Sequence, residues 1–586
     1  MKKIIFSGIL LFIGFVACFI LCKNHQVDKY ENRISLIESS IELYESGEQQ
    51  IVFISICNKA ERANVFKGSG STFELALKEA NKKAKQFIKA NNYEAEWVKI
   101  DLVTSKRKIK YSDLSKEIYS SRHEFFRYGL AFDSDFNFAL LETELNGAKI
   151  YEYDNGGIDL EYLNLYLKKA GRNDEIISEL PLEYILFETN GFFCDEDNNI
   201  YTLSNSGYSV GRRNIEILDS LYVKSLLKNS TDFLKNQIND DGSFIYGIYP
   251  RFDNDIENYN IVRHTSTVWS LICAYRIQED EQLKKDIEKT IEYMLDEVVY
   301  KDENTAYLYE KKSNEIKLGG CGMAVIALTE YMDVFNNTNY LDVCNALGNG
   351  ILTMFDEDTG QYIHVLNGDF SNKEKFRTIY YDGEATFALS KLYGLTQEQK
   401  WLDMAEIAVN HFIEENYEQY KDHWIAYSLN EITKYVDNEK YYSFALKNAQ
   451  ENLQAIYERD TTYHTYLELL MATFETYDRM KERNISVEYE KEFDLDFFLD
   501  TIYYRSNHML NGYFFPEYAM YMKSPERILN SFFVRHDGFR IRIDDIQHNI
   551  DGYYMYYKNY EKLLSYGMKF YINEYKSKSN MIQNMT

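Results

Sequence analysis

Proline and glycine are scarce in this sequence, whose 586 residues include only 4 Pro and 28 Gly. This composition excludes collagen-like and proline-rich architectures. Hydrophobic residues make up 45% of the chain, so a packed core can form and general disorder is excluded. A chain of this length is expected to form two or three domains.

Positive charge is also in short supply. The chain has 65 Lys and Arg against 92 Asp and Glu, which gives a formal net charge of −27. A protein this acidic repels phosphate backbones and anionic headgroups, so nucleic acid is not expected as a partner. Aromatic residues, in contrast, reach 16% and include 52 Tyr. Tyrosine suits both ordinary cores and wet sugar-binding surfaces.

The cysteines do not pair in the sequence. None of the 7 belongs to a CxxC motif, which argues against a zinc site of clustered thiolates and against a disulfide framework. We therefore expect buried free thiols, no bound metal and no cofactor. The cysteines beyond the N-terminal apolar segment are Cys57, Cys194, Cys273, Cys321 and Cys344.

The first 25 residues have the pattern of a signal anchor. Lys2 and Lys3 precede an apolar run over residues 4–22, which is long enough to span a bilayer as a helix. A basic start before such a run predicts that the amino end stays inside and the rest lies outside. A cleaved signal peptide is the alternative. We expect a single-pass protein of the cell membrane, held by this helix, with an extracellular C-terminal domain.

Residues 26–49 are predicted to form a charged juxtamembrane helix, and residues 50–215 an α/β accessory region. Runs rich in β-branched residues predict strands over residues 50–57 and 96–104. The spacing of Ser71 and Glu74 is that of a capping box, which predicts a helix from there to about residue 90. These elements indicate a small βαβ-like unit. No catalytic constellation is visible in this region.

After residue 215 the hydrophobic pattern changes to paired helices. Residues 282–295 carry a single apolar stripe, as in a helix with one solvated face, whereas residues 319–331 are apolar nearly all round. The two kinds alternate six times, which predicts an (α/α)6 barrel over residues 216–570 and a polar tail over residues 571–586. Outer helices are expected to begin near Asp219, Gln282, Tyr340, Lys400, Lys440 and Lys481, and inner helices near His264, Gly319, Gly383, His423, His464 and Asp545.

Three turns between these helices share a glycine before an aromatic residue: residues 240–244 (DDGSF), 358–362 (DTGQY) and 510–514 (LNGYF). They resemble the DG-aromatic turns of terpenoid-cyclase and prenyltransferase toroids, and similar turns in six-hairpin glycosidases. The resemblance covers residues 215–570. It implies the toroid fold, which hosts several chemistries.

Polar residues gather at the starts of the expected inner helices. In such a barrel these helices run parallel, so their first turns meet at one rim and form one cleft. An N-cap requires one Asp and accounts for Asp382, Asp422 and Asp544 singly, but not for an added His, Trp, Arg or second acid. Likewise, each His taken alone fits a buried hydrogen-bonding role. The clusters comprise Arg263, His264, Tyr381, Asp382, Glu384, Asp422, His423, Trp424, His464, Asp544, Asp545 and His548.

The motifs of related toroid families narrow the chemistry. Class II terpenoid cyclases use a DxDD acid motif, but residues 542–545 read RIDD. Cys321 lies in a GCG sequence and lacks the following His of the zinc-binding motif of lanthionine cyclases. Six-hairpin carbohydrate enzymes remain, and residues 513–554 resemble the closing portion of bacterial cell-surface toroid proteins associated with polysaccharides.

These observations predict a membrane-anchored protein that processes an extracellular polysaccharide or cell-wall glycan by glycosidic cleavage. Such cleavage pairs a protonated carboxylic acid with a carboxylate across the scissile bond. Glu384 and Asp545 are the first candidates, with Asp382, Asp422 and Asp544 as alternates. The predicted substrate-binding residues are Tyr381, Arg263, His264, His423, Trp424, His464 and His548, with Trp424 as a stacking platform.

Two alternatives remain open from the sequence. A uronic-acid lyase or epimerase would use a His or Tyr base, with Arg263 neutralising the substrate carboxylate. A glycan-binding or scaffold component of an envelope assembly system would need no catalytic pair. An enzyme should show two carboxylates facing one cleft, whereas a binding module should show aromatic residues without such a pair.

Overall fold

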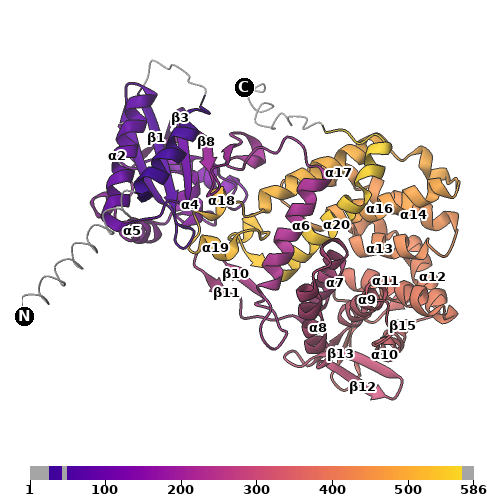
Figure 1. The fold of residues 1–586 in the computed structure, drawn as a ribbon. Helices are drawn as coiled ribbons and strands as arrows, with labels where there is room; N and C mark the ends of the chain where they lie inside the picture. Colours follow the sequence, from indigo (N-terminus) through magenta and orange to yellow (C-terminus); the bar gives the residue numbers. More distant parts are fainter. Residues whose placement is uncertain (1–24, 42–48, 571–586) are drawn as a thin grey trace, which may run out of the picture.

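The structure, a computed structural model, describes residues 25–41 and 49–570 (Figure 1). Residues 1–24, which hold almost all of the expected signal anchor, and the expected polar tail over residues 571–586 lie outside the described residues. Within the described ranges, no helix combines the length and the apolar character needed to cross a membrane.

An antiparallel seven-stranded sheet organises the N-terminal region. Its strand order is β2-β1-β3-β8-β4-β5, and β9 pairs with β8. The long central strands β3 and β8 pair along almost their whole length. The strands are β1 (Gln50–Cys57), β2 (Asn64–Gly70), β3 (Trp97–Lys110), β4 (Gly129–Ala131), β5 (Ala139–Leu140), β8 (Glu183–Cys194) and β9 (Ile200–Thr202).

The expected βαβ-like unit exists in a different form. β2 and β3 are both antiparallel to β1, so they are parallel to each other, and α2 (Phe73–Asn91) connects them across β1. The sequence pattern missed β2 because this edge strand is polar and contains two glycines. Gly68 lies under α2, where a Cβ would sit 2.0 Å from the Ala76 carbonyl oxygen. Glycine at this position allows α2 to pack closely on β2, and for that reason the strand lacks the apolar pattern by which strands are recognised in a sequence.

A helix occupies residues 25–38, within the range expected for the juxtamembrane helix. Its residues Tyr30, Ile34 and Ile37 are buried in one core together with α2 and one face of β1 and β3. Described residues of this segment are thus part of the α/β region. Outside the sheet, that region also contains α3 (Tyr111–Ser120), α4 (Glu142–Gly147) and α5 (Leu160–Lys169).

Six helices of the C-terminal region form a closed ring. Each packs against the next in chain order, and the last packs against the first, so the inner layer of an (α/α)6 barrel is complete. Each of the six helices begins within a few residues of the start expected from the sequence. Its members are α7 (Ile261–Gln278), α9 (Leu318–Val334), α11 (Tyr380–Thr396), α13 (His423–Ile432), α16 (Thr465–Glu482) and α20 (Ile543–Ser565).

A second layer of helices surrounds the ring, and each contacts an inner helix. Five begin close to the expected positions. The sixth was expected near Lys481 but begins at Leu495, because α16 continues to Glu482 and a short 3-10 turn follows. The outer helices are α6 (Ser220–Lys235), α8 (Glu281–Leu295), α10 (Leu341–Leu352), α12 (Gln399–Glu414), α14 (Glu439–Gln450) and α17 (Leu495–Met509).

Short strands form in the segments between barrel helices, where the sequence analysis predicted only connections. β12 (Val298–Asp302), β13 (Thr305–Glu310), β14 (Glu315–Lys317), β17 (Val365–Asn367) and β18 (Asn372–Glu374) form a five-stranded sheet. This sheet lies beside α10 in Figure 1. Its strands directly precede α9 and α11 and so fix where these inner helices begin.

The two regions share one hydrophobic core. The same cluster contains Phe53 and Phe187 of the sheet and residues of every inner helix. A late segment with α18 (Pro516–Ala519) and α19 (Pro525–Ile528) returns to the α/β region, next to β8 and α4 in Figure 1. There the Tyr521 hydroxyl lies 2.8 Å from the Ser55 hydroxyl.

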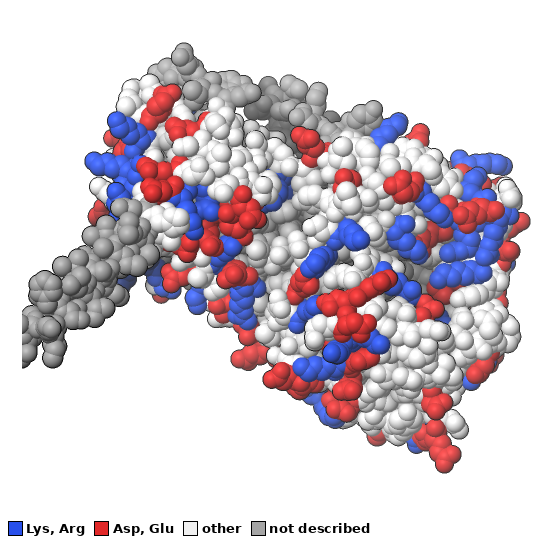
Figure 2. Space-filling view, viewed as in Figure 1, with Lys and Arg blue, Asp and Glu red and all other residues white. Residues whose placement is uncertain are grey.

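Surface charge is mixed on the face shown in Figure 2, where acidic and basic side chains alternate in small groups. The net charge of −27 therefore does not appear there as one continuous acidic field. Ion pairs between neighbouring side chains include Lys228 with Asp232 and Arg527 with Asp253.

Candidate functional site at the amino-terminal rim of the barrel

The first turns of the inner helices contact one another at one rim. Arg263 of α7 pairs with Asp544 of α20 at 2.8 Å, and His548 of α20 lies 2.8 Å from Glu468 of α16. Glu384 of α11 packs directly against Gly319 of α9. The expected convergence of these helix starts is therefore observed, and it places most of the polar clusters in one region.

Three acids from α11 and α13 form the first part of the site: Asp382, Glu384 and Asp422. Their exposures are 3%, 6% and 0%. Asp422 caps α13 by accepting a 2.9 Å hydrogen bond from the Trp424 amide, which leaves its second oxygen buried and without a hydrogen-bond partner. The buried Oε2 of Glu384 also has no hydrogen-bond partner among the described residues.

Burial without a Lys or Arg partner among the described residues determines the protonation of Glu384 and Asp422. Burial, followed by the nearby carboxyls of Asp422 and Asp382, raises the pKa of Glu384 well above its ordinary value. Burial also raises the pKa of Asp422, reinforced by Asp382 and Glu468. A carboxylic acid kept protonated near neutral pH is what a general acid requires.

Asp382 is held by a histidine that the sequence reasoning did not select. His364 accepts a 2.9 Å hydrogen bond from the Arg377 amide through Nδ1, so its Nε2 carries the hydrogen. That Nε2 donates to Asp382 Oδ1 at 3.0 Å. His364 precedes α11 on the connection between β16 (Gln361–Tyr362) and β17, and no periodic pattern marks it as part of the site.

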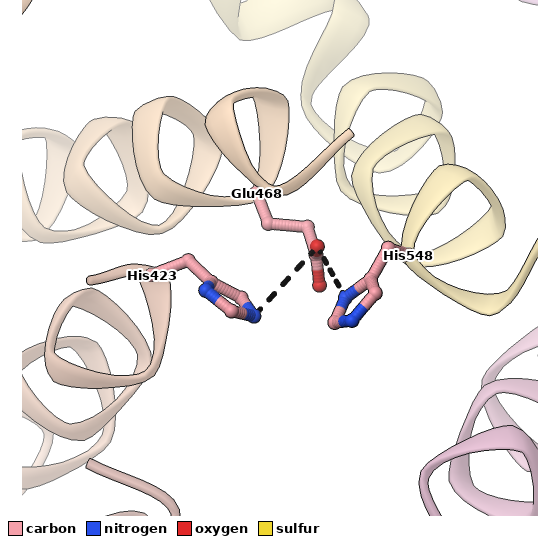
Figure 3. Close-up of side chains that lie close together, drawn as sticks. All are labelled: His423, Glu468 and His548. Carbon is pink, nitrogen blue, oxygen red and sulfur yellow. Dashed lines mark hydrogen bonds and ion pairs between the residues drawn. The ribbon is translucent and has the colours of Figure 1, made fainter. Parts of the chain in front are cut away.

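Two histidines lie beside a fourth buried acid, Glu468 of α16 (Figure 3). His548 Nδ1 lies 2.8 Å and His423 Nε2 lies 4.0 Å from Glu468 Oε2. The other carboxyl oxygen, Oε1, accepts a 3.1 Å hydrogen bond from the Tyr427 hydroxyl. His464 stacks on His548, with ring centroids 4.9 Å apart.

Burial also favours the neutral forms of Glu468 and of the three histidines beside it. Burial raises the pKa of Glu468 well above its ordinary value. Burial, with His548 and His464 nearby, lowers the pKa of His423 well below 6.5, and burial lowers the pKa of His548 to about 4 and that of His464 to about 3. The histidines are therefore neutral and can act as bases or ligands.

A mixed ion-pair cluster forms the partly exposed side of the rim. Asp544 pairs with Arg263 at 2.8 Å and with Arg542 at 2.9 Å. Asp545 pairs with Arg542 at 3.3 Å and with Arg540 at 3.5 Å. The Arg263 side chain is 38% exposed, so this cluster borders solvent while the acids of α11 and α13 lie inside.

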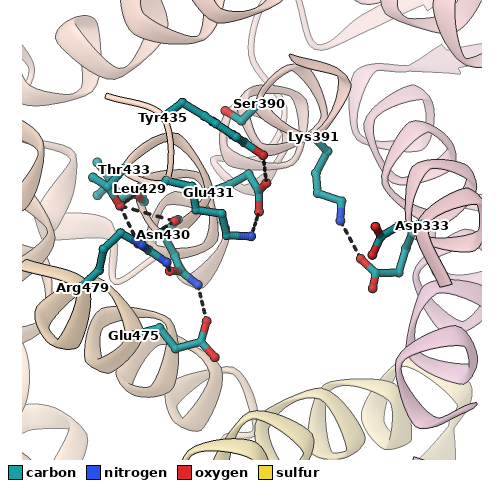
Figure 4. Close-up of polar contacts among 12 residues, drawn as sticks. Asp333, Ser390, Lys391, Leu429, Asn430, Glu431, Thr433, Tyr435, Glu475 and Arg479 are labelled. Atoms are coloured by element: carbon teal, nitrogen blue, oxygen red, sulfur yellow. Dashed lines mark hydrogen bonds and ion pairs between the residues drawn. The ribbon is translucent and has the colours of Figure 1, made fainter. Parts of the chain in front are cut away.

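At the opposite, carboxyl-terminal end of the ring, buried acids are paired with basic side chains (Figure 4). Glu330 pairs with Lys391 at 2.6 Å and with Arg276 at 2.7 Å, and these cations outweigh the effect of burial and lower its pKa to about 2. Glu431 pairs with Lys434 and accepts a hydrogen bond from Tyr435. Buried acids at the carboxyl-terminal rim thus have basic partners, as expected for structural groups.

The structure corrects several roles expected from the sequence. His264 is completely buried, and its two ring nitrogens already contact the Tyr259 hydroxyl at 2.7 Å and the Thr290 carbonyl at 2.9 Å. Both ring nitrogens thus have partners within the fold, as the alternative of a buried hydrogen-bonding histidine expects. Trp424 is 2% exposed and packs on Trp269 inside the ring, so it offers no open stacking platform.

The structure does not place Glu384 beside Asp545, although the sequence favoured these two acids as the catalytic pair. The carboxyl neighbours of Glu384 are Asp422 and Asp382, whereas Asp545 lies between two arginines. Tyr381 is 9% exposed, and its ring lies with the Glu384 carboxyl against the same side of Gly319. The acids that share one environment are thus those of α11 and α13.

Two further acids were missed because they lie deeper in the helices. Glu468 is completely buried, and Asp551 of α20 is 2% exposed with a hydrogen bond from Gln547. Each follows a rim histidine by about one helical turn, Glu468 after His464 and Asp551 after His548. An acid on an apolar helix, one turn after a polar cluster, is the signal that identifies them.

No family profile matches this sequence, and no curated protein sequence is similar to it. Solved structures with a similar fold include a D-mannose isomerase, at 10% identity and a TM-score of 0.44, covering 59% of this chain and 99% of that protein. A cellobiose 2-epimerase from Bacillus thermoamylovorans has 14% identity, a TM-score of 0.43 and coverages of 58% and 99%. A GH76 α-mannanase from Bacteroides thetaiotaomicron has 12% identity, a TM-score of 0.41 and coverages of 58% and 97%. The barrel assignment rests on the closed ring of helix contacts described above.

Proposed function

We propose that this protein processes an extracellular polysaccharide or cell-wall glycan at the amino-terminal rim of its barrel, most directly by cleaving a glycosidic bond. The observation that carries the proposal is the pair of buried acids Glu384 and Asp422, which have no Lys or Arg partner among the described residues and lie near Asp382 and a partly exposed rim. Such groups are costly to bury, and proteins retain them chiefly where chemistry uses them.

Glu384 is the proposed general acid, because its pKa is raised well above the ordinary value. Asp422 is the proposed paired carboxylate, because it is the strongest charged neighbour of Glu384. The two titrate as a coupled pair, so that one proton is retained when the other is lost. Asp382, oriented by His364, supports the same environment.

Substrate approaches from the side of Arg263, Arg542 and His464, which border solvent. The guanidinium groups offer several donors to sugar hydroxyls or to an acidic substituent. Asp544 and Asp545 balance these arginines and keep the rim polar without a large net charge. In this proposal Asp545 orients the rim and does not transfer protons.

The location is part of the proposal. The basic and apolar start of the sequence supports a membrane anchor with the barrel outside the cell. Protease added to intact cells should then remove residues 216–570. Full protection in cells whose envelope admits the protease contradicts the extracellular placement.

The catalytic proposal predicts that Glu384→Gln and Asp422→Asn reduce glycan turnover by roughly 10²–10⁴-fold while the protein stays folded. Cell-wall glycans and bacterial polysaccharides are the substrates to assay, with released reducing ends as the readout. Glu431→Gln is the matched control, because it makes the same change at the structural rim. It should lower the melting temperature and leave the rate per folded molecule unchanged.

A folded Glu384→Gln protein with unchanged turnover refutes the role of this acid. Binding of glycan without any turnover by the unmodified protein supports the binding or scaffold alternative instead. Both outcomes are read on the same preparation, by reducing-end release and by retention on immobilised glycan.

The neutral histidines favour one second candidate, a uronic-acid lyase or epimerase. His423 and His548 are unprotonated at neutral pH and so can remove a proton next to a carboxylate, which Arg263 would neutralise. A lyase yields an unsaturated, ultraviolet-absorbing product, and an epimerase exchanges substrate hydrogen with deuterated solvent. A hydrolase does neither.

A further inference from the structure

Four carboxyl groups inside the ring have no Lys or Arg partner among the described residues: Glu384, Asp422, Glu468 and Asp551. No Lys or Arg is among the groups that shift the pKa of any of them. The structural rim shows that this chain supplies such partners elsewhere, as Lys391 and Arg276 do for Glu330. These four inner acids therefore lack the positive charge that would stabilise their ionised forms, whereas Asp544 and Asp545 at the same rim have arginine partners.

His423, a residue type that can bind a metal, also lacks partners for its polar atoms among the described residues. It is 1% exposed, and neither of its ring nitrogens has a hydrogen-bond partner among the described residues. A buried imidazole without partners loses the hydrogen bonds that water would supply, at a cost of about 1–3 kcal/mol. Its Nε2 points toward Glu468 in Figure 3.

We propose that His423, Glu468 and His548 form a binding site for one divalent cation of the zinc type. The ligand atoms are one nitrogen from each histidine and a carboxylate oxygen, and all lie within 4.8 Å of one another. Two His and one Glu form a common ligand set of catalytic zinc sites, which leave a fourth position open.

The distances between the ligand atoms are close to those of a zinc site, and small side-chain movements would complete it. Tetrahedral zinc with bonds of about 2.0–2.1 Å holds its ligand atoms about 3.3 Å apart. Here His548 Nδ1 lies 2.8 Å and His423 Nε2 lies 4.0 Å from Glu468 Oε2. Side-chain rotations that move ligand atoms by about 1.5 Å or less therefore produce the required geometry, with no change in the helices.

Neighbouring groups are placed to orient the ligands. Asp422 Oδ1 lies 3.5 Å from His423 Nδ1, so that a small rotation of the imidazole would form the carboxylate–histidine–metal arrangement that presents Nε2 to an ion. Tyr427 donates to Glu468 Oε1 and so leaves Oε2 available. The His548 side chain is 14% exposed, which gives the ion and a fourth ligand a route from solvent.

A bound cation would also explain why three helices contribute single residues to one point. α13, α16 and α20 lie next to one another in the ring, and their ligands are far apart in the sequence. Zinc at this point would bind a water or a sugar oxygen at its open position and lower the pKa of that oxygen. This proposal departs from the expectation of no bound metal drawn from the sequence.

The test measures metal binding and needs no substrate. The purified full chain is stripped with a chelator, incubated with ZnCl2, dialysed and analysed for zinc by mass spectrometry. We expect about one zinc per chain for the unmodified protein and loss of this zinc in His423→Ala, His548→Ala and Glu468→Gln. Zinc should also raise the melting temperature of the unmodified protein but not of these variants.

His464→Ala is the matched control, because His464 stacks on His548 and is not one of the ligands. It should retain one zinc. Circular dichroism of each variant establishes that it is folded before zinc is counted, and Glu468→Gln keeps the shape of the side chain if an alanine variant does not fold. Absence of zinc from the folded unmodified protein, or equal zinc in all folded ligand variants, overturns the site.

The result is independent of the proposed glycosidic cleavage. Zinc binding without turnover refutes only the proposed function, and turnover by a folded protein that takes up no zinc refutes only the metal site. Both properties lost together in Glu468→Gln, but turnover alone lost in Glu384→Gln, assign the ion and the acid to one reaction centre.

Discussion

Buried acids in this barrel fall into two groups that differ in one respect, the presence of a basic neighbour. Glu330 has Lys391 and Arg276, and its pKa falls to about 2. Glu384 has only other acids, and its pKa rises. The same residue type on two adjacent inner helices is therefore charged at one rim and protonated at the other.

This difference predicts how Glu384→Gln changes stability with pH. Because the pKa of Glu384 is raised in the folded protein above its ordinary value of 4.5, the folded state holds the proton over a pH range where the unfolded state has lost it. The unmodified protein thus loses stability as pH rises above about 4.5, by at most about 1.4 kcal/mol per unit for this group. The glutamine variant should become progressively more stable than the unmodified protein, as measured by urea unfolding from pH 5 to pH 8.

Asp545→Asn provides the contrast, because Asp545 has Arg540 and Arg542 as partners. This variant should be less stable than the unmodified protein at neutral pH. A Glu384→Gln protein whose relative stability is flat with pH would show that Glu384 is ionised in the fold.

The sequence revealed only some of these residues. Asp382, Glu384, Asp422, His423 and His548 were recognisable because polar residues interrupt apolar helices at their starts. The distinction between paired and unpaired acids was not recognisable, because it depends on which neighbouring helix supplies a cation. For the same reason the sequence favoured Asp545 over Asp422 as the partner of Glu384.

At the scale of helices, hydrophobic periodicity predicted the barrel well because inner and outer helices differ in how much of their circumference is buried. α9 is buried on nearly all sides, whereas α8 has one apolar stripe. Short strands such as β14 and β17 escaped notice because two or three residues cannot show a period. Their pairing depends on residues about 50 positions apart.

Helix α9 carries two consecutive glycines whose surroundings differ. A Cβ at Gly319 would lie 1.9 Å from Glu384 Oε2 and 2.4 Å from Tyr381 Cδ1, while the nearest atom at Gly320 would be 3.4 Å away. Gly319→Ala should therefore displace Glu384 and destabilise the protein by about 1–3 kcal/mol. Gly320→Ala should be neutral or stabilising by up to about 1 kcal/mol, because alanine is the better helix former.

Thermal unfolding and glycan turnover of the two variants check this prediction. Loss of turnover in folded Gly319→Ala, with Gly320→Ala active, would show that the site depends on this close contact between α9 and α11. Equal melting temperatures for both variants would contradict it.

For the molecule as a whole, the sequence indicated a change in pattern near residue 215 but not how the two parts meet. The segment after α17 folds back onto the α/β region, where Glu517 pairs with Arg213 at 2.7 Å and is itself completely buried. Nothing in the periodicity of residues 513–528 predicts this return. It joins the two regions through one continuous core.

Tyr521 lies at the centre of this junction. It is 2% exposed, its hydroxyl contacts Ser55, and its ring lies 5.2 Å from the Lys99 ammonium group, which is itself buried beside Asp101. Tyr521→Ala should cost about 3–5 kcal/mol through lost packing, and it should separate the unfolding of the two regions into two transitions. Tyr521→Phe keeps the ring and should cost only about 1 kcal/mol, with a single transition retained. Differential scanning calorimetry of the full chain distinguishes these outcomes. Two transitions in the unmodified protein, unaffected by Tyr521→Ala, would mean that the shared core does not couple the regions, and that the barrel positions its rim without help from the sheet.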